Sequence, residues 1–249
     1  MSIVFYIGLI LSAAIGLSLG LIGGGGSILT VPILVYFLGV ETREAVGMSL
    51  AVVGATSLFG AFLHHRKGTV NFSSGMLFGI SGIAGAFLGS PLTHLVSEKI
   101  LLLIFAALMF VVALSMLWRK RNAESETIYE VNFYKAIAAG FGVGVLTGFL
   151  GVGGGFLIVP ALVFFGGLPM KQAIGTSLLV IALNCFAGIL GHLSYGLFDM
   201  KIAFLVTALA VFGAVFGTTL SQRFSAAGLQ KSFAFLVLAV AIFLTFKNI

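Results

Sequence analysis

Polar side chains that could bind a ligand recur in pairs along an otherwise apolar chain, always at the same spacing in the sequence. The pairs are Ser49 and Ser177, Thr56 and Asn184, and His64 and His192. Hydroxyls, amides and imidazoles donate hydrogen bonds, so a site lined by them suits an anion. Eight residues separate Asn184 from His192, a little over two helical turns, and both side chains can share one helix face. The pairs therefore indicate a binding stripe, with an interhelical hydrogen bond as the alternative role of Asn184.

The two paired histidines lie near the ends of their apolar segments, where an interfacial role is ordinary. A protonated His64 or His192 would attract an anion at a vestibule or couple a proton to transport. Both roles are hypotheses.

A glycine cluster followed by proline also occurs twice, at the spacing of the polar pairs. The run GGGGSILTVPILVYFLG over 23–39 returns as GVGGGFLIVPALVFFGG over 151–167, so that Pro32 aligns with Pro160. Glycines that break a helix expose backbone N–H groups, and the positive end of a half-helix favours negative charge. The expected donors are Gly25, Gly26, Gly153 and Gly154. Close packing of helices through small residues is the alternative explanation for these glycines.

Acidic residues are absent from the middle of every apolar segment. All seven Asp and Glu residues lie in loops or at segment ends, whereas an intramembrane protease or a carboxylate-based antiporter needs one inside a span. The chain has no HExxH motif and no phosphate-binding loop, and its single cysteine, Cys185, cannot form an internal disulfide. We therefore expect no enzymatic activity, no cofactor and no metal site.

The elements that carry these residues must cross a membrane. Hydrophobic residues make up 60% of the 249 positions and charged residues only 8%, and the mean hydropathy is +1.21. A soluble chain of this length could not hide so much apolar surface. The net charge of +6 is explained by loop orientation in the membrane rather than by binding to nucleic acid.

The apolar pattern predicts an all-α polytopic membrane protein with about ten transmembrane segments. The segments are 3–22, 24–40, 44–63, 72–93, 98–118, 134–150, 152–168, 171–194, 199–221 and 226–247. The two glycine-proline segments, 24–40 and 152–168, are expected to be tilted, interrupted or only partly spanning. The first segment lacks the basic start of a signal peptide and is expected to be retained.

The duplication predicts two five-segment repeats, 1–118 and 134–249, joined by a polar linker at 119–133. Five crossings are an odd number, so the second repeat is expected to be inverted relative to the first. If all ten segments cross, nine of the 13 Lys and Arg residues fall on one side, and eight if the two glycine-proline segments do not cross. The positive-inside rule then places the linker in the cytoplasm and both termini in the periplasm.

The paired Val-Pro runs, Val31–Gly39 and Val159–Gly167, are each followed by Gly-x-Ser, at Gly47–Ser49 and Gly175–Ser177. In these motifs, and over nearly its whole length, the chain resembles the sulfite exporter TauE/SafE family, also called the TSUP permeases.

The resemblance implies a transporter of the bacterial inner membrane that moves small sulfur-containing anions such as sulfite, sulfoacetate or other organosulfonates. It implies two inverted repeats whose opposed hairpins line a central cavity. By the same resemblance, Pro32 and Pro160 would shape the hairpins, with Gly47 and Gly175 as hinge positions. The stripe that contains Asn184 would contact the pathway.

The expected function is a permease for such an anion, acting in efflux by alternating access between the repeats. The expected partners are the anion and the lipid bilayer, with protons as a candidate coupling ion; oligomerisation stays open. A passive anion channel and a non-transporting assembly subunit are the alternatives.

Overall fold

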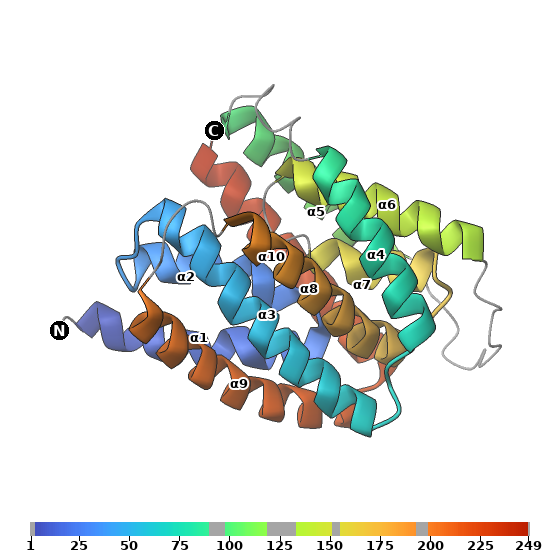
Figure 1. The fold of residues 1–249 in the computed structure, drawn as a ribbon, viewed down its shortest axis with the longest axis horizontal. Coiled ribbons are helices and arrows are strands. Elements are labelled where there is room, and N and C mark those ends of the chain that lie inside the picture. Colours follow the sequence, from blue (N-terminus) through green and yellow to red (C-terminus); the bar gives the residue numbers. More distant parts are fainter. Residues whose placement is uncertain (1–2, 90–97, 119–132, 151–154, 193–198, 249) are drawn as a thin grey trace.

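The computed structural model describes residues 3–89, 98–118, 133–150, 155–192 and 199–248, and the regular elements in these ranges are all helices, joined by short turns (Figure 1). The first half contains α1 (Ile3–Ile22), α2 (Gly25–Tyr36), α3 (Thr42–Arg66), α4 (Phe72–Gly89) and α5 (Glu98–Trp118). The second half contains α6 (Phe133–Leu150), α7 (Gly155–Phe164), α8 (Met170–His192), α9 (Met200–Arg223) and α10 (Ala226–Asn248). The all-helical prediction is confirmed.

The sequence repeat is also a repeat of helices. The helices α3, α4 and α5 begin at Thr42, Phe72 and Glu98. Their counterparts α8, α9 and α10 begin at Met170, Met200 and Ala226, in each case the equivalent position of the second repeat. Each predicted apolar segment contains one helix.

The helices fall into two groups by length. Within the described residues, windows in α1, α3, α4, α8, α9 and α10 are long and apolar enough to cross a membrane. The helices α2 and α7 have 12 and 10 residues, or about 18 and 15 Å at 1.5 Å per residue, about half of a hydrocarbon core. Full crossing by all ten segments stays a prediction.

The first two helices form an antiparallel hairpin. Gly23 has a positive φ of 76°, which reverses the chain between α1 and α2. A β carbon on Gly26 would lie 2.5 Å from Leu19 Cγ, and one on Gly8 would lie 2.8 Å from Leu38 Cδ2. The start of α2 therefore packs against the later part of α1, and the residues just after α2 pack against its earlier part.

Contacts between the halves are reciprocal. The helix α1 packs on α9, and the equivalent pair, α6 and α4, packs in the same way (Figure 1). A β carbon on Gly16 would overlap the carbonyl of Ala210, and one on the equivalent Gly144 would overlap the carbonyl of Gly82. Small residues let these backbones approach closely, as in other membrane helix pairs.

The equivalent helices α3 and α8 cross each other in opposite directions. A β carbon on Gly60 would lie 3.1 Å from Leu178, and one on Gly188 would lie 3.2 Å from Leu50. A position late in one helix thus meets a position early in the other, so α3 and α8 are antiparallel.

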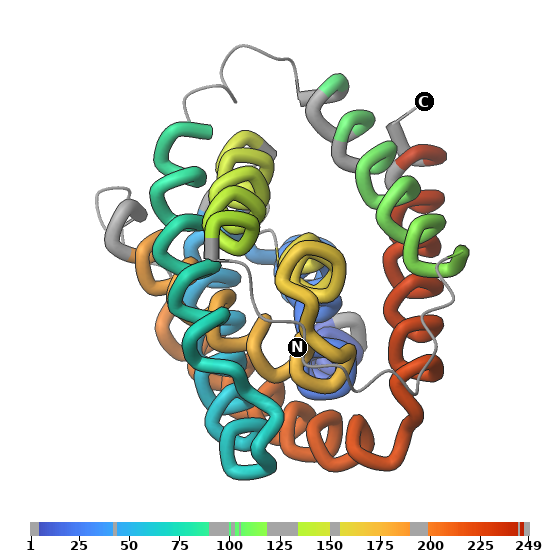
Figure 2. Tube along the Cα trace, turned by 90° about the vertical axis from the view of Figure 1, so that its right-hand side faces the viewer, coloured from blue at the N-terminus to red at the C-terminus, as the bar shows by residue number. Residues whose placement is uncertain are grey.

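The short helix α7 occupies the interior. Its residues from Gly155 to Val163 are all buried, and Figure 2 shows it in the middle of the bundle, with α5 and α10 together on one side. Large apolar side chains such as Phe87 and Phe204 are exposed on the outside, as expected for a surface that faces lipid.

Candidate functional site

The two glycine breaks meet inside the bundle. A β carbon on Gly24 would overlap the carbonyl of Gly155, and one on Gly155 would lie 2.7 Å from Ser27 Oγ. Ser27 and Gly155 are equivalent positions of the two repeats. Their contact brings the start of α2 next to the start of α7.

The start of α2 presents backbone donors. Gly25 and Gly26 form its first turn and are buried, and Gly24 at the N-cap makes no side-chain capping hydrogen bond. Ser27 does not replace that cap, since its hydroxyl donates to the Gly24 carbonyl at 2.7 Å. The first N–H groups of a helix have no partner within it, and the helix dipole adds positive charge there. Gly153 and Gly154, expected to act at the second break, lie outside the described residues.

The serine of the second repeat lies at the glycine break of the first. Ser177 is buried, and its Oγ would lie 2.5 Å from a β carbon on Gly23. Its hydroxyl donates its one proton to the Ile174 carbonyl at 2.7 Å, so a hydrogen bond to an anion at the break requires that proton to turn away from the carbonyl. The equivalent Ser49 makes the same bond within α3, to the Val46 carbonyl at 2.8 Å.

Sequence reasoning missed Ser18. Its hydroxyl is buried without a hydrogen-bond partner, and its Oγ would lie 3.4 Å from a β carbon on Gly25, at the start of α2. Other buried hydroxyls, such as those of Ser12 and Thr147, donate to a carbonyl one turn earlier. Ser18 has no counterpart in the second repeat, where Leu146 takes its place. From the sequence, Ser18 could have been found as a polar residue close to the turn of a glycine hairpin, but not by comparing the two repeats.

Thr56 and Asn184 lie on the same helices but not at the breaks. Thr56 Oγ1 and Asn184 Oδ1 are buried without partners. A β carbon on Gly82 of α4 would lie 3.6 Å from Asn184 Oδ1 and 3.6 Å from the Gly140 carbonyl of α6. Asn184 therefore faces the α4–α6 pair, two turns along α8 from Ser177.

The predicted hairpin and hinge residues have distinct surroundings. Pro32 and Pro160 lie inside α2 and α7, where each proline removes one backbone donor from its short helix. Gly47 is buried in α3. A β carbon on Gly175 would lie 2.5 Å from the Thr69 carbonyl and 3.0 Å from His64 Cβ, so Gly175 lets the chain after α3 pack on α8. A hinge role for either glycine stays a prediction.

His64 lies inside the protein. It is 1% exposed, its Nε2 lies 3.1 Å from the Gly20 carbonyl, and its Nδ1 lies 2.9 Å from Thr69 Oγ1. The ring therefore joins α3 to the last turn of α1, close to the first glycine break. The backbone of His192 ends α8, and its side chain lies outside the described residues.

Two lysines gather at the end of α9. Lys67 Nζ donates to the Thr218 carbonyl at 3.1 Å, and Lys171 Nζ donates to the Gln222 carbonyl at 3.2 Å. Cations at a helix C-terminus are favoured by the dipole and supply partners for unpaired carbonyls. Partial burial lowers the pKa of the Lys67 ammonium.

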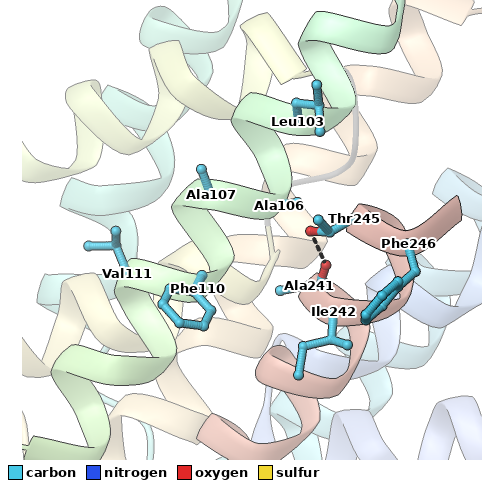
Figure 3. Close-up of a pocket in the computed structure, with 9 residues that line it drawn as sticks. All are labelled: Leu103, Ala106, Ala107, Phe110, Val111, Ala241, Ile242, Thr245 and Phe246. Carbon is cyan, nitrogen blue, oxygen red and sulfur yellow. Dashed lines mark hydrogen bonds between the residues drawn. The ribbon is translucent and has the colours of Figure 1, made fainter. Parts of the chain in front are cut away.

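A pocket of about 470 Å³ lies between α5 and α10, away from the glycine breaks (Figure 3). Its lining is Leu103, Ala106, Ala107, Phe110, Val111, Ala241, Ile242, Thr245 and Phe246. Thr245, its one polar side chain, donates to the Ala241 carbonyl at 2.8 Å. An apolar pocket of this kind does not suit an anion. Within the described ranges, no three metal-ligating side chains come together.

Comparison with known proteins agrees with the helical repeats and the glycine-proline breaks. Residues 8–244 match the family described as Sulfite exporter TauE/SafE. A "Probable membrane transporter protein" of Xylella fastidiosa (strain 9a5c) is 38% identical over 94% of this chain and 92% of its own length. YdhB, another "Probable membrane transporter protein", from Bacillus subtilis, is 28% identical over 91% of this chain and 94% of its own. No solved structure matches the chain at a significant level. The chain belongs to the sulfite exporter TauE/SafE family and is a multi-pass membrane transporter.

Proposed function

We propose that this transporter moves a small sulfur-containing anion, such as sulfite, sulfoacetate or another organosulfonate, in the direction of efflux. The observation that carries the proposal is the meeting of two glycine breaks, at Gly24 and Gly155, beside buried hydroxyls. An anion there would exchange its water for N–H and O–H donors. Among the side chains that the structure describes, the acidic ones of Glu41, Glu44 and Asp199 stand at helix starts and caps, away from the breaks.

The proposed anion site combines both repeats. Its donors are the N–H groups of Gly25 and Gly26, with the hydroxyls of Ser18 and Ser177; Gly153, Gly154 and Ser49 would complete it from the second break. Thr56, Asn184 and the side chain of His192 would line the path on either side. The central cavity that this site requires is part of the proposal.

The proposed mechanism is alternating access by two inverted repeats. The antiparallel crossing of the equivalent helices α3 and α8 supports inversion, since equivalent helices of a parallel repeat would run in the same direction. Rocking of one repeat against the other would open the breaks to each side in turn. Pro32 and Pro160, inside the short helices, would let these helices bend during that movement.

We further propose that the protein lies in the bacterial inner membrane, with the linker 119–133 in the cytoplasm and both termini in the periplasm. The positively charged ends of α3 and α9, with Lys67 and Arg223, support this orientation.

Reconstitution into liposomes tests the proposal. Purified protein should catalyse saturable uptake of labelled sulfite or sulfoacetate, and excess unlabelled anion on the opposite side should accelerate it by counterflow. A passive channel would give flux without saturation or counterflow. Absence of flux for every sulfur anion in the panel would contradict the proposal and favour a non-transporting subunit. Inside-out membrane vesicles, which take up an exported substrate, test the direction.

A further inference from the structure

We propose that His64 is the proton-binding residue of the transport cycle and that the Thr69 hydroxyl switches acceptor when the proton binds. The inference rests on the proposed function and adds to it a coupling ion, one atom that receives it and a positioning residue.

The Gly20 carbonyl fixes one side of the ring. It lies 3.1 Å from His64 Nε2, and a carbonyl oxygen only accepts hydrogen bonds. Nε2 therefore carries a hydrogen in the neutral and in the charged ring alike. Nδ1 is the only atom of His64 that can gain or lose a proton without breaking the contact with α1.

Thr69 faces Nδ1 with one hydroxyl proton and two acceptors. Its Oγ1 lies 2.9 Å from His64 Nδ1 and 3.0 Å from the His64 carbonyl oxygen. In the neutral ring, the hydroxyl donates to Nδ1. In the charged ring, Nδ1–H donates to Oγ1, and the hydroxyl turns to the His64 carbonyl.

Both protonation states thus keep every hydrogen bond of a buried ring, and a small rotation of one hydroxyl connects them. A buried polar group without a partner is costly, so an ordinary buried histidine favours one state strongly. The Thr69 hydroxyl therefore gives Nδ1 a hydrogen-bond partner in either state. In the step itself, a hydronium ion gives its proton to the Nδ1 lone pair and leaves as water, and when the N–H bond breaks the proton returns to a water molecule as hydronium.

Among the charged and titratable groups around His64, its own ring is the one that we propose changes charge. On its own element, the neighbouring groups are His65, Arg66 and Lys67, and Lys67 is held on the Thr218 carbonyl of α9. The His65 ring packs on Phe72, 4.9 Å between centroids. The facing surface of α1 is Gly20 and that of α8 is Gly175, while Lys171 of α8 is held on the Gln222 carbonyl and Arg223 of α9 is exposed. No acidic side chain faces the ring in this described region.

The proton site adjoins the proposed anion site. Gly20 is in the last turn of α1, three residues before Gly23, whose N–H donates to the Leu19 carbonyl at 2.8 Å. Positive charge on His64 would therefore stabilise an anion at the break, and by linkage the anion would favour the proton. The second repeat has Leu197 where the first has Thr69, so only His64 has the switching hydroxyl. One proton would move in each cycle.

The experiment measures proton and anion flux together in liposomes that contain a pH-sensitive dye, with sulfoacetate, whose sulfonate stays ionised across the pH range. The wild-type protein should move about one proton with each anion. His64→Gln keeps a donor for Gly20 and an acceptor for Thr69 but cannot take up a proton, so it should abolish coupled proton flux. His65→Gln is the control, because His65 is exposed and its ring packs on Phe72; this variant should keep the wild-type ratio.

Thr69→Val removes the switch without charging the site, and should move the pH profile of transport to lower pH, because the charged ring loses its acceptor. Thr69→Ser should restore the wild-type profile. The inference is overturned if wild-type flux carries no proton, if His64→Gln keeps the coupled proton flux, or if His65→Gln abolishes it. If His64→Gln does not fold, an unshifted Thr69→Val profile overturns it. Absence of anion flux in the wild-type protein would instead contradict the proposed function.

Discussion

Gly24 and Gly155 lie backbone to backbone, so that a β carbon on the first would overlap the carbonyl of the second. The contact joins the starts of two short helices from different halves of the chain. It is possible because Gly24 lacks a side chain, and it places the start of α2 against the start of α7 in the interior. The binding proposal and the packing of the repeats therefore depend on the same pair.

Gly24→Ala tests this contact. The added methyl group must push α2 and α7 apart, and overpacking of this kind costs about 1–3 kcal/mol. We expect a lower thermal unfolding temperature in detergent and loss of counterflow.

Gly142→Ala is the matched control, because a β carbon at Gly142 meets no atom within 4 Å. In the interior of α6 this change should be neutral or stabilise the helix by about 0.5–1 kcal/mol. Equal behaviour of the two variants would show that Gly24 is not in a tight contact.

Ser18→Ala and Ser177→Ala test the hydroxyls at the break. A hydrogen bond to a charged group contributes about 1.5–3 kcal/mol, so each variant should raise the KM for the anion by about 10- to 100-fold. Ser18→Ala should leave thermal stability equal or higher, because the buried hydroxyl that it removes has no partner inside the protein.

Ser115→Ala serves as control, since that hydroxyl donates to the Val112 carbonyl within α5. An unchanged KM in Ser18→Ala, with transport intact, would remove Ser18 from the anion site.

Asn184→Leu tests whether this amide serves transport or packing. The volume is nearly kept, and the change removes a buried acceptor that has no partner, so thermal stability should be equal or higher. Counterflow should fall at least about tenfold if the amide lines the pathway, a loss of about 1.4 kcal/mol in transition-state stabilisation. Reduced stability with full counterflow would identify Asn184 as a structural residue instead.

Single-cysteine labelling tests the inversion of the repeats. Glu41 and Pro169 are equivalent positions of the two halves, directly before α3 and α8, and both are exposed. The free thiol of Cys185 is buried, so a Cys185→Ser background allows one cysteine to be placed at either site.

A membrane-impermeant maleimide should label Glu41→Cys only from the periplasm and Pro169→Cys only from the cytoplasm. Labelling of both positions from the same side would exclude inverted repeats.

Much of the helical fold could be predicted because the residues that mark the ends of helices lie next to those helices in the sequence. Glycines at 23–26 and the proline at 32 mark the turn and the short helix that follows, and the same marks return in the second half at 151–155 and 160. The lengths of the apolar segments then predict the remaining helices, because a segment in lipid must form all its backbone hydrogen bonds internally, as a helix does.

The neighbours of each polar residue could not be predicted in this way. Ser177 and Asn184 share a face of α8, as their spacing indicates, yet Ser177 meets Gly23 whereas Asn184 meets Gly82. The reason is that α8 crosses several helices along its length, and helix periodicity fixes a face but not what covers it. Ser18 was missed because the candidate polar residues were chosen as pairs shared by the two repeats, and Ser18 has no polar counterpart in the second repeat.

Because α1 packs on α9 of the other half, its packing partner is made late in biosynthesis. When the ribosome has delivered α1 to the bilayer, the helix that covers its glycines, α9, has not yet been translated. Until then, the glycine-lined face of α1 is exposed to lipid and accessible to membrane quality-control proteases. A product truncated before α9 is therefore expected to be degraded rather than to accumulate as half a transporter.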